Sequence, residues 1–191
     1  MTLSDAERAQ LLRVARCSID DAVRGGNSLG AAREALPPGA YLAARRGVFV
    51  TLLQPRGDDV ASGRRLRGCL GSIEADRPLP EAVASTAAAA AMRDPRFPPL
   101  AQEELATLCI SISVLTPMQP AGRVEEIELG RHGLQLVRGE QRSVFLPQVA
   151  LEQGWTRDQL LAQLAIKAGL PGDGWLDARL SKFETEAFSE S

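Results

Sequence analysis

The chain has few residues of the kinds that covalent cross-links and metal centres need. Its 191 residues include three cysteines and one histidine, and aromatic residues make up 4%. Cys17, Cys69 and Cys109 are too few and too scattered for a disulfide framework, and no Cys-x-x-Cys pair occurs. These scarcities exclude a disulfide-rich scaffold and indicate reduced thiols, as is typical of a cytoplasmic protein.

Long apolar runs and a strong charge imbalance are also missing. No segment approaches the ~20 apolar residues of a membrane span, and the N-terminal segment has no secretory pattern. The formal net charge of -2 gives no general attraction to nucleic acid. We therefore expect a cytoplasmic protein that binds neither membrane nor nucleic acid.

The residues that are present fit a globular protein of one domain or two small lobes. Hydrophobic residues make up 45% of the chain, which is an ordinary fraction. Nearly all the positive charge is arginine, because lysine occurs only at positions 167 and 182. Guanidinium groups suit bidentate binding of carboxylates or phosphates, although a coding bias towards Ala, Arg and Gly explains the same composition.

Periodicity and capping signals predict the secondary structure. Capping residues, helical spacing of apolar positions and terminal glycines predict helices from Ser4 to Gly25, from Pro80 to Met92 and from Thr156 to Gly169. Alternating or β-branched runs predict strands at 47–53, 65–73, 108–115, 134–137 and 143–146, and a weak edge strand at 183–188. The polar segment from Pro55 to Gly63 predicts a turn that joins the first two strands as a hairpin. Since regular β-α-β alternation is missing, we predict an α+β fold, with a mainly antiparallel sheet flanked by helices.

The predicted strand at 65–73 carries the strongest functional signal. It reads Arg-Leu-Arg-Gly-Cys-Leu-Gly-Ser-Ile, so Cys69 lies between two glycines. Strand alternation places Arg67 and Cys69 on one face and Ser72 on the other. Glycine inside a strand marks a bulge, a bend or the close approach of a ligand or another backbone. The pattern therefore favours a site at Cys69.

Two further segments contribute candidate side chains. Three prolines prevent a helix in the segment from Arg93 to Leu100, where we expect Arg96 to face a cleft, Asp94 to cap the turn and Phe97 to fill the core. The turn Gly130-Arg-His-Gly133 holds His132. We predict that these two segments converge with the strand of Cys69.

The leading chemical hypothesis pairs Cys69 with His132 in nucleophilic catalysis. A thiolate is the reactive form of cysteine, and a neighbouring imidazole or guanidinium favours it. We predict catalytic roles for these two residues, and substrate-binding roles for Arg67, Ser72, Arg96 and Arg131.

Other interpretations stay open. Cys69 is also consistent with a small core residue, and His132 with a hydrogen-bonded structural residue. A metal site of Cys69, His132 and Glu74 is chemically reasonable, but the ligands lack close spacing, so we predict neither a metal nor a cofactor. A non-catalytic cleft would instead bind a peptide, a small molecule or a partner enzyme.

Several motifs occur together in the order and spacing of one family. They are Leu66-Arg-Gly-Cys-Leu-Gly71, Asp94-Pro-Arg-Phe-Pro-Pro-Leu100, Gly130-Arg-His-Gly-Leu134, Leu146-Pro-Gln-Val-Ala150 followed by Gly154-Trp155, and Lys167-Ala-Gly-Leu170. On these residues the chain resembles the AMMECR-one domain family, whose prokaryotic members are called protein A of the AmmeMemoRadiSam system. Leu70 and Ser72 stand where the family usually has isoleucine and threonine.

The resemblance covers roughly residues 5–188 and implies one domain in two lobes, with a smaller second lobe and a cleft. It also implies a Memo-type protein and a radical-SAM protein as partners, and it supplies no settled reaction. We therefore expect a cysteine-dependent enzyme or small-molecule-modifying factor. The alternative is a non-catalytic, partner-binding adaptor.

Overall fold

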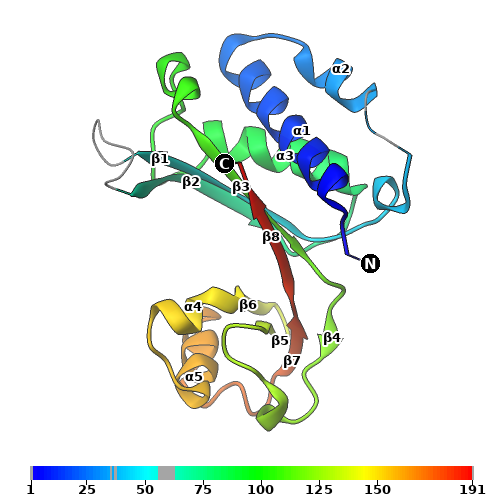
Figure 1. The fold of residues 1–191 in the computed structure, drawn as a ribbon. Coiled ribbons are helices and arrows are strands. Elements are labelled where there is room, and N and C mark those ends of the chain that lie inside the picture. The colour runs from blue at the N-terminus through cyan, green and yellow to red at the C-terminus, as the bar shows by residue number, and fades with distance from the viewer. Residues whose placement is uncertain (1, 35, 37, 56–62, 191) are drawn as a thin grey trace. The chain divides into compact units, whose positions relative to one another are not determined.

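A computed structural model of the chain describes residues 2–34, 36, 38–55 and 63–190. The chain divides into two compact units, residues 1–114 with 186–191, and residues 115–185. Each unit contains a four-stranded sheet (Figure 1). The predicted α+β fold with antiparallel strands and a smaller second lobe is confirmed, whereas a single domain over residues 5–188 stays a prediction.

Among its described residues, the first unit contains three α-helices and one sheet. Its helices are α1 (Asp5–Arg24), α2 (Ser28–Glu34) and α3 (Leu79–Met92), with the 3-10 turns η1 (Ala40–Leu42) and η3 (Gln102–Ala106). Its strands are β1 (Val48–Pro55), β2 (Arg64–Ser72), β3 (Cys109–Leu115) and β8 (Thr185–Ser189), in the order β2-β1-β3-β8. Figure 1 shows α1 and α3 on one face of this sheet.

Helix α1 begins and ends at the residues that the sequence indicates. The Ser4 hydroxyl accepts a hydrogen bond from the Glu7 N–H, and the Glu7 carboxylate accepts one from the Ser4 N–H. Gly25 ends the helix with φ 74°, a left-handed conformation that glycine adopts without strain. In the described part of the chain, neither α1 nor any other helix has the apolar length that crossing a membrane requires.

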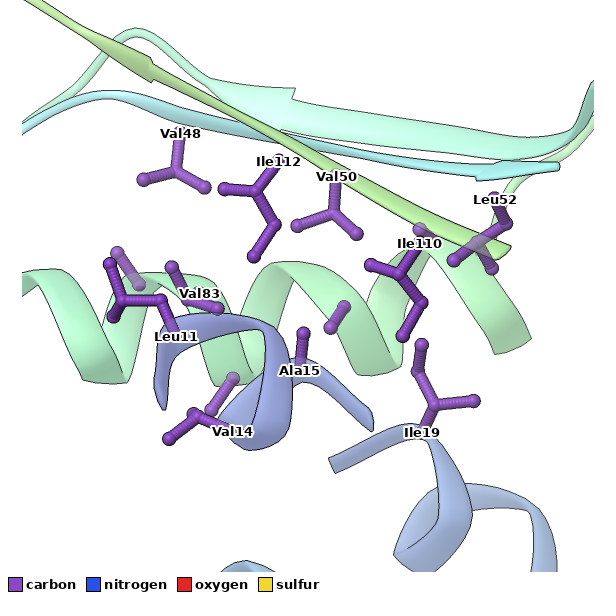
Figure 2. Close-up of a cluster of buried hydrophobic side chains, with 14 of the residues drawn as sticks. Leu11, Val14, Ala15, Ile19, Val48, Val50, Leu52, Val83, Ile110 and Ile112 are labelled. Atoms are coloured by element: carbon purple, nitrogen blue, oxygen red, sulfur yellow. The ribbon is translucent and has the colours of Figure 1, made fainter. Parts of the chain in front are cut away.

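The core of the first unit fills the space between the sheet and helices α1 and α3. Side chains of β1 and β3 alternate between this core and the opposite face, as the sequence predicts for 108–115. Figure 2 shows the packed residues, which include Leu11, Val14, Ala15, Ile19, Val48, Val50, Leu52, Val83, Ile110 and Ile112. The opposite face of the sheet therefore presents the intervening side chains, Thr51 among them.

The second unit has its own sheet and core. Its helices are η4 (Val124–Glu126), α4 (Pro147–Glu152) and α5 (Arg157–Lys167). Its strands are β4 (Gln119–Pro120), β5 (Gly133–Arg138), β6 (Gln141–Phe145) and β7 (Arg179–Phe183), in the order β4-β7-β5-β6. Leu134 and Leu136 of β5 pack with Leu160, Leu161 and Leu164 of α5.

The structure revises one strand prediction and tests another in part. The weak strand predicted at 183–188 is two strands, because β7 ends at Phe183 and β8 begins at Thr185 in the other sheet. Strands β1 and β2 pair antiparallel, as the hairpin prediction requires. The turn predicted from Pro55 to Gly63 lies largely outside the described residues.

Candidate active site around Cys69

Strand β2 contains a β-bulge at Arg67. Gly68 lies opposite Leu52 and Leu66 lies opposite Leu53, so Arg67 is the additional residue. Regular alternation predicts Arg67 and Cys69 on one face, and the bulge interrupts that alternation. Cys69 lies opposite Thr51, on the sheet face away from α1 and α3.

The two glycines beside Cys69 make room for other parts of the protein. A Cβ atom on Gly68 would lie 2.5 Å from the Ala90 carbonyl oxygen of α3. A Cβ atom on Gly71 would lie 2.3 Å from the Phe49 ring. The close approach that the glycines predict is therefore accounted for by the helix backbone at one position and by an aromatic ring at the other.

We expect Gly68→Ala to lower the free energy of unfolding by ~2 kcal/mol or more, because the added methyl group must displace helix backbone. Urea denaturation followed by circular dichroism measures the change. Gly30→Ala is the control, since a Cβ atom on Gly30 would lie 3.6 Å from Asn27 Oδ1, which is an ordinary van der Waals distance. Equal losses in both variants would contradict the close contact at Gly68.

The outward backbone groups of Cys69 are bound by the segment that follows α3. Asp94 Oδ2 accepts a hydrogen bond from the Cys69 N–H at 2.8 Å. Arg96 Nη2 donates to the Cys69 carbonyl oxygen at 3.0 Å. Because β2 is an edge strand, these side chains replace the hydrogen bonds of a further strand and protect the edge.

Asp94 is a buried carboxylate with partners on both oxygens. Its side chain accepts hydrogen bonds from Arg96 Nε at 3.0 Å, from Arg96 Nη2 at 2.7 Å and from the Arg96 backbone N–H at 3.1 Å. These Arg96 contacts are the main reason that the pKa of Asp94 lies well below its ordinary value, and the Cys69 N–H adds to the effect. The turn cap predicted for Asp94 is confirmed, and its bond to Cys69 is an addition.

Arg67 is buried and bound by a carboxylate that the sequence does not single out. Its Nε and Nη2 donate to the Glu104 carboxylate at 2.7 and 2.8 Å, and Nη1 donates to the Pro98 carbonyl oxygen at 3.0 Å. Glu104 also accepts from Gln54 Nε2 and from the Ala101 N–H. The Arg67 hydrogen bonds are the largest cause that lowers the pKa of Glu104 to about 2. These contacts fix the bulge and turn Arg67 towards the protein.

Phe97 lies beside two guanidinium groups instead of in the core. The ring centroid is 5.9 Å from Arg67 Cζ and 5.5 Å from Arg96 Cζ, which is within cation–π range. Phe97 is half-buried and belongs to neither core cluster. This position corrects the core role predicted for it, and it holds the arginines side by side.

The Cys69 thiol is half-buried and has polar neighbours. The Thr51 hydroxyl donates a hydrogen bond to Cys69 Sγ at 3.2 Å, and Thr51 also lies opposite Ser111 of β3. The pKa of Arg96 is raised, mainly by Asp94 and to a smaller extent by the Cys69 side chain. The Thr51 hydroxyl therefore orients the sulfur, and the charge of the nearby Arg96 is shared with Asp94.

Ser72 does not lie with the thiol. It is on the face of β2 opposite to Cys69, and its hydroxyl oxygen accepts a hydrogen bond from the Glu74 N–H at 2.9 Å. Its side chain lines a pocket together with Leu70. The strand thus presents its thiol and its hydroxyl to different environments.

His132 and Arg131 belong to the second unit, where both have close partners. His132 is 8% exposed, and its Nδ1 accepts a hydrogen bond from the Glu128 backbone N–H at 3.0 Å. In the neutral ring Nε2 then carries the hydrogen, and it lies 3.9 Å from Glu184 Oε1. Arg131 donates to Glu184 at 2.9 Å and to Glu128 at 3.1 Å, contacts that raise its pKa. The Nδ1 lone pair, through which a neutral His132 would accept a proton, is therefore already used in a hydrogen bond.

The predicted pairing of Cys69 with His132 stays a prediction, because Cys69 belongs to the first unit and His132 to the second. Among the residues that the structure describes, no group of three His, Cys, Asp or Glu side chains is placed to hold a metal ion. Arg67, Cys69 and Arg96 do come together. They are joined by Asp94, which the sequence predicts only as a turn cap, and by Glu104, which the sequence does not single out.

Comparison with known proteins agrees with the motif pattern around Cys69. The AMMECR1 family profile matches residues 12–188. The chain belongs to the AMMECR1 family. It is 40% identical over 199 residues to Protein MK0488 of Methanopyrus kandleri, covering 100% of this chain and 90% of that relative. A protein of Thermococcus onnurineus is 40% identical over 187 residues, which cover 94% of this chain and 88% of that relative.

A solved structure supports the same AMMECR1 fold. The crystal structure of the uncharacterized protein PH0010 from Pyrococcus horikoshii matches with a TM-score of 0.78 and 35% sequence identity. The match covers 100% of this chain and 94% of that chain. These AMMECR1 relatives carry names that state no activity, so a functional hypothesis has to come from the chemistry of the residues.

Proposed function

We propose that Cys69 is the reactive group of a cysteine-dependent enzyme or small-molecule-modifying factor. One observation carries the proposal: Asp94 and Arg96 bind both outward backbone groups of Cys69, while the Cys69 residue is only partly buried and its sulfur accepts a hydrogen bond from Thr51. A nucleophile whose backbone is fixed on a strand meets a substrate in a defined orientation, which lowers the entropic part of the barrier.

The proposed chemistry is attack by sulfur on an electrophilic carbon. The Cys69 thiol gives its proton to solvent or to a base, and the sulfur lone pair forms a bond to the substrate carbon. The electron pair of the bond that breaks moves to a substrate oxygen or to the leaving group. Thr51 orients the sulfur through its hydroxyl. Arg96, whose side chain is 53% exposed, faces the negative charge that develops on the substrate.

The second unit enters the proposal through His132 and Arg131. With Nδ1 engaged by Glu128, His132 would act as a hydrogen-bond donor through Nε2 and not as the base. Arg131 would bind an anionic substrate group only by giving up contacts with Glu128 or Glu184. A catalytic role for His132 thus requires hydrogen-bond donation from Nε2, and a substrate role for Arg131 requires the loss of one of its ion pairs.

The proposal is tested by the rate at which iodoacetamide alkylates Cys69 at pH 7, read by mass spectrometry. We expect Arg96→Gln to slow the reaction about tenfold, because the guanidinium beside the sulfur is lost. Arg96→Lys should recover part of the rate. Arg93→Gln is the matched control, an exposed arginine three residues earlier. Equal rates in all four proteins, each with an unchanged circular dichroism spectrum, would contradict an activated Cys69.

Memo-type and radical-SAM partners belong to the proposal on the strength of the motif resemblance. Co-purification from cells that express all three proteins tests this. If the enzyme proposal holds, Cys69→Ser retains both partners and loses turnover in the complex. Retained turnover in Cys69→Ser would instead favour the non-catalytic adaptor.

A further inference from the structure

A pocket lies on the opposite side of β2 from the Cys69 thiol, within the first unit. It is bounded by the end of β2, the start of β1 and helix α3, and its volume is about 340 Å³. This volume is near the lower end of the ~300–1,000 Å³ range of small-molecule sites. The pocket is therefore large enough for a compact organic ligand.

The sequence of α3 explains why a hollow forms there. Ala82, Ser85, Thr86 and Ala89 all line the pocket, and their spacing of three and four residues places them on one helix face. Gly68 permits close contact between the strand and the helix backbone. Further along β2, the small side chains of α3 leave space that larger residues would fill.

The charged lining favours an anion. Three arginines, Arg46, Arg77 and Arg93, line the pocket with two carboxylates, Glu74 and Asp76. Arg77 and Asp76 neutralise each other, since Arg77 Nε and Nη2 donate to the Asp76 carboxylate at 3.1 and 2.9 Å. In the part of the chain that the structure describes, the Arg93 guanidinium has no hydrogen-bond or ion-pair partner. Arg93 is thus available to a ligand.

The remaining lining residues favour a ligand with an apolar part. Val48, Leu70, Ala82 and Ala89 contribute apolar surface, whereas Ser72 and Thr86 contribute hydroxyl groups. The Ser85 hydroxyl already donates to the Ala82 carbonyl oxygen at 3.2 Å. Guanidinium and hydroxyl donors together suit a carboxylate or phosphate group. Apolar surface beside such donors is the usual composition of small-molecule sites.

We propose that this pocket binds a small organic anion, with its carboxylate or phosphate at Arg93 and its apolar body between α3 and the end of β2. The proposal is independent of the function proposed for Cys69, because the thiol is on the other face of the sheet. Cys69→Ser should therefore bind the same ligands as the wild type.

Phenyl phosphate is a suitable probe, and its binding is followed by the backbone amide signals in nuclear magnetic resonance spectra. We expect saturable shifts of the Ser72, Thr86 and Ala89 amides, with a dissociation constant below about 1 mM. Inorganic phosphate and phenol, which each carry half of the ligand, should bind at least about tenfold more weakly. Phenylacetate in the same titration separates a carboxylate site from a phosphate site.

Two variants test the predicted contacts. Arg93→Gln should weaken phenyl phosphate binding at least about fivefold by removing the free guanidinium, and Ala89→Leu should abolish it by filling the hollow. Arg123→Gln, which changes an 81% exposed arginine of the second unit, is the control. Unchanged affinity in Arg93→Gln and Ala89→Leu, shifts confined to other residues, or no saturation up to about 10 mM would overturn the proposal.

Discussion

Replacement of Asp94 by alanine is expected to lower the free energy of unfolding by ~3 kcal/mol. Asp94 is 3% exposed, and its side chain accepts hydrogen bonds from the Cys69 N–H and from Arg96. Its removal leaves the Cys69 N–H without an acceptor and the Arg96 guanidinium without its counter-charge. Urea denaturation at pH 7, followed by circular dichroism, measures the loss.

Two further variants separate the causes of the Asp94 effect. Asp94→Asn keeps the shape and one acceptor oxygen but removes the charge, so an intermediate loss is expected. Asp76→Asn removes a carboxylate from an exposed ion pair with Arg77, and its free energy of unfolding should stay close to that of the wild type, because solvent screens exposed pairs. A loss below ~1 kcal/mol in Asp94→Ala would contradict the role of Asp94 in holding β2.

Glu104→Gln is expected to cost ~3 kcal/mol, because it leaves the buried Arg67 without a counter-charge. Arg67 is 8% exposed, and Glu104 binds it through both carboxylate oxygens. Glu103→Gln is the matched control, since Glu103 is exposed and adjacent in the chain. We expect the control to stay within ~0.5 kcal/mol of the wild type. Equal stability of the two variants would contradict the importance of the Arg67–Glu104 pair.

The Glu104 contribution should also depend on pH with a defined sign. Its pKa falls from the ordinary 4.5 to about 2 on folding, so the folded state stabilises the ionised form. The stability gain is complete above the ordinary pKa and is lost as the pH falls towards the folded pKa. The difference between wild type and Glu104→Gln should be constant near neutral pH and should shrink below pH ~4.5. A difference that is undiminished at pH ~3 would contradict this pKa.

Local signals predict local structure well in this chain. The Ser4 and Glu7 pattern predicts the capping box of α1, and alternation at 108–115 predicts β3, because both depend on residues close in sequence. The motif around Cys69 likewise identifies the segment where several buried polar contacts meet.

Contacts between distant residues are what the sequence does not disclose. Glu104 is 37 residues from Arg67, and Asp94 is 25 residues from Cys69, so neither pair leaves a spacing signal. The bulge at Arg67 depends on pairing with β1, and the neighbouring glycine alone does not distinguish a bulge from a bend or a close approach. The engagement of His132 Nδ1 depends on how the backbone of Glu128 folds back in the turn.

The most direct measurement is the distribution of label among the three cysteines after native protein reacts with less than one equivalent of iodoacetamide. We predict that Cys69 takes most of the label. Cys109, which is 5% exposed with its Sγ 3.5 Å from the Glu190 carbonyl oxygen, should stay unmodified. Preferential labelling of Cys17, or a Cys69 as unreactive as Cys109, would contradict the assignment of Cys69 as the reactive centre.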